Sequence, residues 1–203
     1  MKLKKTETKN LSALGPVVAI CENDAQYAKL MEETLLETYL ESLGDITFPT
    51  FVLSNLDQSA LKQAHLLKSW RGVDALERLA LSIDKGMKDR GWNLVFVRLS
   101  SRSPKDAALL RPDFRAVLMR HYGELPQGAR NSKLLALYAA ATESMGCKNG
   151  AEALDLLTAS ERIQDDLSNM TGLNVCVRKF VSFLPEYELR AFVWDKVCSS
   201  DSL

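Results

Sequence analysis

Hydrophobic and polar positions along the chain follow two different periods, and the change from one to the other divides the sequence into helices and strands. Apolar residues recur at spacings of three and four, which is typical of amphipathic helices. We expect such helices over 24–43, 57–70, 73–90, 110–122, 129–145 and 150–167.

Runs rich in β-branched and aromatic residues indicate strands between and after these helices. Such runs occupy 17–21, 45–54, 94–99, 173–184 and 186–198. Pro49 lies inside the second run and favours an edge strand or an extended loop, because proline cannot donate to a central ladder. We expect the last two runs, separated by Pro185, to form an antiparallel pair.

Capping residues mark where several helices begin and end. Gly91 is placed to end the helix over 73–90, and Gly146 follows another helix. Asn149 with Glu152, and Thr158 with Glu161, have the spacing of reciprocal N-terminal caps. These caps predict that the long helical stretch after residue 110 is divided into short elements.

The amino-acid composition excludes several kinds of partner and site. The 26 basic and 26 acidic residues cancel, so no general attraction to nucleic acid or to an anionic membrane is expected, and any anion site must be local. Four scattered cysteines and two histidines signal neither a zinc site nor a disulfide framework. Reduced thiols fit a cytoplasmic protein, and Gly15-Pro16 interrupts the apolar stretch that a secretory signal would need.

One polar cluster stands out, at the end of the strand predicted over 94–99. The stretch NLVFVRLSSRSPKDA places Arg98 in the strand and Arg102 and Lys105 in the turn after it, a small cationic nest suited to phosphate oxygens. A purely structural interpretation also fits, with Ser103 as N-cap, Pro104 at the first helical position and Asp106 completing a capping box. Local chemistry alone favours the structural interpretation.

Two sequence motifs favour the functional interpretation of this cluster. FVRLSSRSPKDA (96–107) resembles the strand and turn of the cell division cycle protein 123 family, which carries a Lys or Arg in the strand followed by S-P-[KR]-D-A. VRKFVSFLPEYELRAFV (177–193) resembles the same family's R-K-W or R-E-W segment and its E-F-R-x-F-V continuation, and SERIQDDL (160–167) before it is also similar. The order and broad spacing of the motifs agree with the family.

The resemblance implies an ATP-grasp fold and a role for each motif residue. Arg98 would reach the nucleotide phosphates, the serine-rich turn would line the site, and the backbone around Arg178 to Phe180 would form a hinge against adenine. Glu188 and Arg190 would share one face of the following strand, where a plain salt bridge is an equally good interpretation. The residues expected to bind the nucleotide are Arg98, Ser100, Ser101, Arg102, Ser103, Arg178, Lys179, Phe180, Glu188 and Arg190.

The chain also departs from the family pattern. Ser100 and Ser101 stand where the family commonly has Asn-Trp, Phe180 replaces the usual tryptophan, and Arg98 replaces a lysine. A guanidinium can hydrogen-bond to two oxygens at once, whereas an ammonium acts as a point charge. We therefore expect an arginine at position 98 still to bind phosphate. The segment that holds magnesium in the family is not matched, so the resemblance covers only the front part of the family's domain. Magnesium is therefore expected only if that segment exists.

Together these patterns predict an α+β, ATP-grasp-like protein that is helix-rich with an antiparallel sheet, incomplete at its C-terminal end. We expect an N-terminal α/β part over 1–92, a phosphate-binding strand-turn and helical part over 93–172, and the start of a C-terminal ATP-grasp sheet over 173–203. No catalytic residue or metal ligand is assigned, and little or no metal-dependent catalysis is expected of this chain alone.

The function that the resemblance implies is that of an ATP-binding, chaperone-like assembly protein. Its partner would be the gamma subunit of translation initiation factor 2, with ATP as cofactor and without nucleic acid or membrane. Two alternatives stay open: an ATP-dependent ligase of the ATP-grasp type, and an interaction domain that does not bind nucleotide.

Overall fold

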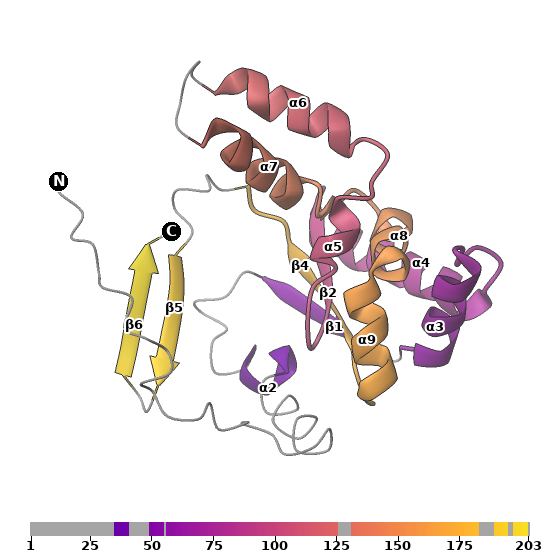
Figure 1. Ribbon diagram of the computed structural model, residues 1–203. Helices are drawn as coiled ribbons and strands as arrows, with labels where there is room; N and C mark the ends of the chain where they lie inside the picture. The colour runs from indigo at the N-terminus through magenta and orange to yellow at the C-terminus, as the bar shows by residue number, and fades with distance from the viewer. Residues whose placement is uncertain are drawn as a thin grey trace.

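A four-stranded antiparallel sheet with helices packed on it forms the centre of the molecule (Figure 1). The computed structural model describes residues 35–40, 49–54, 56–125, 131–182, 189–194 and 197–202. The sheet has the order β1-β4-β2-β3. Its strands are β1 (Thr50–Leu53), β2 (Val95–Leu99), β3 (Gly146–Cys147) and β4 (Val175–Lys179). The α+β class, the helix-rich composition and the antiparallel sheet predicted from the sequence are confirmed.

Alternation along β2 gives the sheet two different faces. Val95, Val97 and Leu99 are fully buried in the hydrophobic core, whereas Phe96 and Arg98 are half-buried on the opposite face. β4 runs beside β2, with Val97 opposite Val177 and Phe96 opposite Arg178. One face of the sheet is therefore core, and the other is available to a site.

Eight helices are described, and several of them bury their apolar sides together with the core face of the sheet. They are α2 (Leu36–Leu40), α3 (Gln58–Leu67), α4 (Asp74–Asp89), α5 (Lys105–Ala108), α6 (Phe114–Glu124), α7 (Ser132–Glu143), α8 (Gly150–Ala159) and α9 (Glu161–Asn169). The core cluster draws residues from α3, α4, α8 and α9, as the apolar spacing predicts. α6 has no buried residue and packs beside α7, and the two form the projecting pair at the top of Figure 1.

The predicted edge strand is confirmed, but the predicted pairing of 173–184 with 186–198 is wrong. β1, which follows Pro49, lies at one edge of the sheet. β4 is hydrogen-bonded to β1 on one side and to β2 on the other, while β5 (Leu189–Trp194) pairs with β6 (Val197–Ser202). The run Val175 to Val177 is buried throughout, so both faces of β4 are covered at these residues.

Helix caps predicted from the sequence have mixed outcomes. Gly91, with φ of +63°, follows α4 as expected, and Asn149 caps α8 by accepting from the backbone N–H of Glu152 at 2.8 Å. The cap assigned to Thr158 is wrong, because Ser160 caps α9 and the Thr158 hydroxyl donates to the carbonyl of Leu154.

Gly146 lies in β3 rather than at a helix end, since α7 has already ended at Glu143. The predicted strand over 17–21 lies outside the described residues, and of the helix over 24–43 only α2 and the residue before it are described.

The three parts expected along the chain each contribute to this sheet. β1 comes from the first part, β2 and β3 from the second, and β4 from the third. Whether these parts are domains stays a prediction. Over the described ranges, no helix combines the length and the apolar character needed to cross a bilayer.

Gly150 offers a direct test of the packing of α8 against α4. A Cβ at this position would lie 2.1 Å from the carbonyl oxygen of Ala80, so the backbone itself would have to move. We expect Gly150→Ala to lower the free energy of unfolding by about 1–3 kcal/mol in urea denaturation. The matched control is Gly123→Ala in α6, where a Cβ meets nothing within 4 Å and should raise stability by about 0.5–1 kcal/mol. Equal effects of the two substitutions would contradict the close approach.

Candidate cationic cavity

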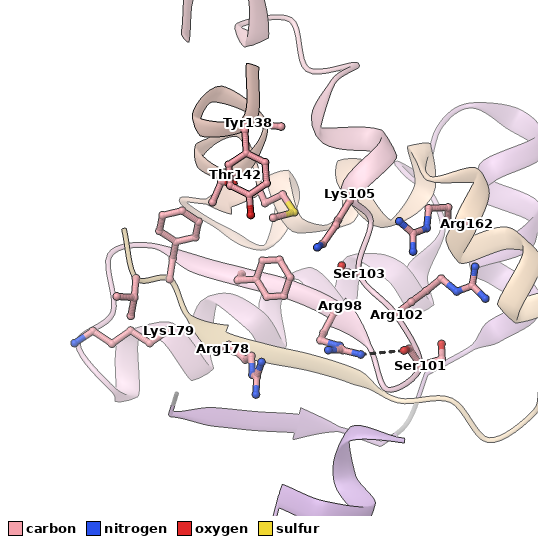
Figure 2. A pocket seen from close by; sticks show the side chains of 15 residues that line it. Arg98, Ser101, Arg102, Ser103, Lys105, Tyr138, Thr142, Arg162, Arg178 and Lys179 are labelled. Carbon is pink, nitrogen blue, oxygen red and sulfur yellow. Dashed lines mark hydrogen bonds between the residues drawn. The ribbon is translucent and has the colours of Figure 1, made fainter. Parts of the chain in front are cut away.

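A cavity of about 560 Å³ lies over the end of β2, on the side of the sheet that carries Phe96 and Arg98 (Figure 2). This volume is within the range of about 300–1,000 Å³ typical of small-molecule sites. Its lining residues come from β2, the turn after it, the start of α5, α7 and the turn that follows it, α9, and the end of β4 with the two residues after it. They are Phe96, Arg98, Ser101, Arg102, Ser103, Lys105, Tyr138, Ala141, Thr142, Met145, Arg162, Arg178, Lys179, Phe180 and Val181.

Sheet geometry places the first of these side chains. Phe96 and Arg98 are two residues apart on β2 and so share a face, and Arg178 lies opposite Phe96 on β4. The Arg178 guanidinium is held from the neighbouring strand, because its Nε donates to Thr50 Oγ1 at 3.1 Å. β2 and β4 thus supply the floor of the cavity, and β1 holds Arg178 in place.

Arg98 braces the turn that follows its own strand. Its guanidinium donates to the backbone carbonyls of Leu99, Ser100 and Ser101 at 2.9, 3.2 and 3.0 Å. The turn is closed by a hydrogen bond from the Leu99 amide to the Arg102 carbonyl at 2.9 Å. Arg98 therefore shapes the turn as well as placing a positive charge at the cavity.

Arg102 is held from α9 by a buried carboxylate. Its Nη2 lies 2.6 Å from Asp166 Oδ1, and the Asp166 side chain is only 4% exposed. An ion pair with one partner buried keeps a fixed geometry better than a pair on the surface. The turn after β2 is thereby tied to α9.

Asp106 makes a second connection to α9, and the capping box predicted for it is wrong. α5 begins at Lys105 without a side-chain cap, and the Asp106 carboxylate instead accepts from Ser160 Oγ at 2.6 Å and from the Arg162 amide at 3.3 Å. Burial acts to raise the pKa of Asp106, but these hydrogen bonds outweigh it and hold the pKa below its ordinary value of 3.8. Asp106 is thus an anion at the N-terminus of α9, a favourable place for negative charge.

Basic side chains dominate the lining. Six of the fifteen lining residues are Arg or Lys, and none is Asp or Glu. The side chains of Lys105, Arg162 and Lys179 have no hydrogen-bond or ion-pair partner within the part of the chain that the structure describes. Since the chain as a whole carries no net charge, this concentration of cations is a local feature, as the sequence predicts for any anion site.

α7 supplies a wall of the cavity that the sequence analysis did not identify. Tyr138, Ala141 and Thr142 follow one another at spacings of three and one on one face of α7, and Met145 follows in the turn after the helix. This spacing can be read from the sequence, but it shows only that these residues share one face of a helix. It does not show which part of the protein that face contacts. Phe96 and Arg162 were missed for the same reason.

The structure brings together seven of the ten residues expected at the site. Arg98, Ser101, Arg102, Ser103, Arg178, Lys179 and Phe180 line the cavity. Ser100 does not, because it is fully buried and its hydroxyl accepts from the Asn174 amide at 2.8 Å. Glu188 and the side chain of Arg190 lie outside the described residues.

The hinge backbone is partly occupied by the fold itself. The amide of Lys179 donates to the carbonyl of Pro49 at 3.0 Å, and that of Phe180 donates to the carbonyl of Leu94 at 3.1 Å. Neither amide is left for a ligand. A main-chain donor at this edge would have to come from Val181 onward.

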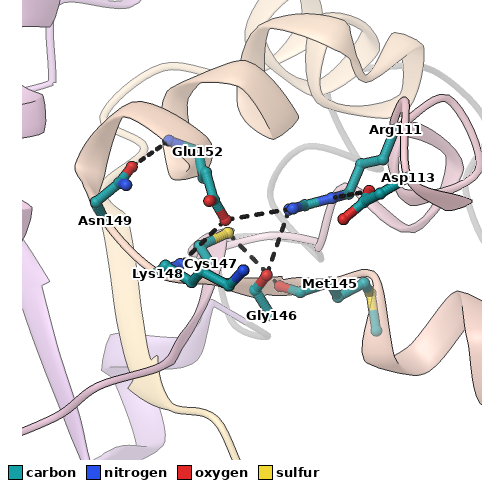
Figure 3. Close-up of polar contacts among 8 residues, drawn as sticks. All are labelled: Arg111, Asp113, Met145, Gly146, Cys147, Lys148, Asn149 and Glu152. Atoms are coloured by element: carbon teal, nitrogen blue, oxygen red, sulfur yellow. Dashed lines mark hydrogen bonds and ion pairs between the residues drawn. The ribbon is translucent and has the colours of Figure 1, made fainter. Parts of the chain in front are cut away.

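A polar cluster around Arg111 fixes the segment that follows α7 (Figure 3). Arg111 donates to Asp113 at 3.2 Å, and to Glu152 and the carbonyl of Gly146 at 3.3 Å each. Glu152 in turn accepts from the Lys148 amide at 3.1 Å. These contacts hold β3 against the start of α8, and so hold the end of the α7 wall.

Two cysteines of the described part are free and buried, Cys147 and Cys176. Burial raises the pKa of each thiol to about 12, so both stay protonated at neutral pH. The described residues also contain no group of three or more His, Cys, Asp or Glu that could hold a metal ion.

Comparison with solved structures identifies the fold. The chain matches the structure of Cdc123 from Schizosaccharomyces pombe with a TM-score of 0.55 and 16% identity, over 82% of this chain and 60% of that chain. It matches a C-terminally truncated Cdc123 from the same organism with a TM-score of 0.59 and 14% identity, over 84% and 62%. No family model and no curated protein matches the sequence. The chain has a Cdc123-like fold and spans about 60% of the length of these structures.

The contact between Asp106 and α9 predicts a specific dependence on pH. A hydrogen bond to a charged group contributes about 1.5–3 kcal/mol, so Asp106→Ala should lower the free energy of unfolding by about that amount at pH 7. Because folding lowers the pKa of Asp106, its contribution is present above the ordinary value of 3.8 and is lost as the pH falls below it. The gap between wild type and variant should therefore narrow below about pH 4.

Chemical denaturation over a pH series measures this gap. Asp165→Ala, at an exposed position of α9, is the control and should change stability little at any pH. A gap for Asp106→Ala that keeps its full size at pH 2 would show that the charge of the carboxylate is not involved.

Proposed function

We propose that the cavity binds ATP, with the triphosphate among the basic side chains and the adenosine between the end of β4 and α7. One observation carries the proposal: six cationic residues and no carboxylate line a single cavity that also has aromatic walls. Phosphate oxygens need cationic donors, and a base needs an apolar surface on which to stack.

Lys105, Arg162 and Arg102 are the residues best placed for the phosphates. Lys105 and Arg162 have no side-chain partner among the described residues, and Arg102 uses Nη2 for Asp166, leaving donors on its other nitrogens. Figure 2 shows the three on one side of the cavity, near Ser103. Arg98 adds charge from below while its hydrogen bonds support the turn.

The adenosine would lie at the less charged part of the cavity. Phe180 and Val181 line it from the chain after β4, and Tyr138 lines it from α7. The amide of Val181 is the first on this segment that the described residues leave without an acceptor, since those of Lys179 and Phe180 donate within the fold. We assign the hinge contact to that amide.

Magnesium does not fit the residues described around the cavity. Mg²⁺ is bound through carboxylates together with phosphate and water, and no lining residue is a carboxylate. We therefore propose binding of the nucleotide and derive no reaction from this part of the chain. The ligase alternative has no supporting observation among these residues.

The Cdc123-like fold, together with the two sequence motifs, supports a cellular role as well. We propose that the chain acts in the cytoplasm in assembling translation initiation factor 2, by binding its gamma subunit. ATP bound in the cavity would stabilise the form of the chain that recognises the subunit, by the usual linkage between ligand binding and folded-state stability.

The assignment of the phosphates predicts the effect of removing one positive charge. Lys105→Gln and Arg162→Gln should each weaken ATP binding about tenfold in titration calorimetry, because each removes a charge-assisted contact. Both losses should shrink at high salt, since exposed charges are screened. Lys88→Gln, on the exposed end of α4, is the control and should leave the affinity unchanged. ATP affinities that are equal in all four proteins would contradict the assignment.

The proposed partner predicts what the chain captures from a cytosolic extract. An affinity-tagged chain should recover the gamma subunit of initiation factor 2 in salt that removes nucleic acid, because the net charge of the chain is zero. Recovery that increases when ATP is added would support the link to the cavity. Salt-resistant RNA without the subunit would count against this role.

A further inference from the structure

The cavity has two walls of different chemistry. α7 and the turn after it contribute only uncharged residues, namely Tyr138, Ala141 and Thr142 from the helix and Met145 from the turn. The charged residues come from the turn after β2, from the start of α5, from α9 and from the strands β2 and β4. In Figure 2 Tyr138 and Thr142 lie together on one side, away from Arg102 and Arg162.

The hydroxyl groups on α7 are open to a ligand. Tyr138 and Thr142 are half-buried, and neither hydroxyl has a hydrogen-bond partner in the described part of the chain. A half-buried tyrosine ring offers an apolar face with a polar end, which suits a heterocyclic base attached to a sugar. Figure 2 shows the Tyr138 ring directed from the helix into the space above the strands.

Ala141 leaves the space that such a ligand needs. It lines the cavity one turn from Tyr138, and a methyl group is the smallest side chain after glycine's hydrogen. Bare phosphates would not require this wall, because the cationic residues on the other side suffice for them.

We infer that α7 is the nucleoside-recognition wall of the cavity. In this inference, which rests on the proposed function, Tyr138, Ala141 and Thr142 make the site select a nucleoside polyphosphate over a bare polyphosphate. Tyr138 stacks on the base, Ala141 leaves room for it, and Thr142 contacts the sugar or the base edge. A hydroxyl donates and accepts equally well, so this wall gives little discrimination between adenine and guanine.

The test compares two probes, ATP and inorganic tripolyphosphate, by titration calorimetry with the full chain. Tyr138→Ala and Ala141→Phe should each weaken ATP binding about tenfold, through a lost stacking partner and a filled space respectively. Both variants should bind tripolyphosphate within about twofold of wild type, because the cationic side is intact. Tyr138→Phe should retain most of the ATP affinity, since the ring remains.

Matched controls come from the neighbouring helix. Tyr122→Ala and Ala116→Phe change the same residue types at exposed positions of α6 that do not line the cavity, and should leave the affinity for both probes unchanged. Circular dichroism and thermal unfolding establish that each variant is folded. If Tyr138→Ala unfolds the chain, Tyr138→Leu replaces it: this change removes the ring but keeps an apolar side chain, and it should weaken ATP binding while leaving tripolyphosphate binding unchanged.

The outcomes separate this inference from the proposed function. Loss of ATP affinity with retained tripolyphosphate affinity supports the inference. Equal loss for both probes, or no loss for ATP, overturns it while leaving polyphosphate binding in place. Wild-type protein that binds neither probe overturns both the inference and the proposed function.

Discussion

The burial of alternate residues along β2 is the constraint on which the rest of the structure depends. Val95, Val97 and Leu99 are fully buried in the core, and a shift of one residue would place Phe96 and Arg98 there instead. The cost of burying a guanidinium without a partner makes that register unavailable. The same constraint therefore builds the core and sets Phe96 and Arg98 on the opposite face, where the cavity lies.

Two carboxylates that do not line the cavity hold its basic residues in position. Asp166 holds Arg102, and Asp106 binds Ser160 and the amide of Arg162 at the start of α9. Each acid is occupied by a contact within the fold, and neither lines the cavity. This arrangement fixes the positions of the basic residues without placing a negative charge among them. A protein with no net charge can by this means present a strongly cationic site.

Residue patterns predicted those parts of the fold that local periodicity determines. The helices α3 and α4 and the strand β2 follow directly from apolar spacing, and the cationic turn follows from the residues after Leu99. The pairing of β4 could not be predicted, because an apolar run shows that a strand is buried but not which strands flank it. Asp106 has the spacing of a capping residue, yet a tertiary contact with Ser160 takes its carboxylate. Local and tertiary hydrogen bonds compete for such side chains, and sequence alone shows only the first.

The α7 wall of the site could not be predicted from the sequence for a similar reason. Tyr138 and Thr142 lie on one helix face in any reading of the sequence, but only the packing of α7 places that face over β2. The motif residues Arg98, Arg102 and Ser103 were predictable because chain neighbours form the turn. Residues from α7 and α9 complete the cavity from distant positions in the sequence, and Tyr138, for example, follows Arg102 by 36 positions.

The central claim is that one ligand with both phosphates and a base occupies this cavity. Backbone amide chemical shifts of the isotope-labelled chain, followed by NMR during titration with ATP, test it most directly. The account predicts that the largest changes fall in three segments distant in sequence, around Arg102, Thr142 and Val181, and saturate with one common affinity. Changes confined to other surfaces, or none at millimolar ATP, would contradict it.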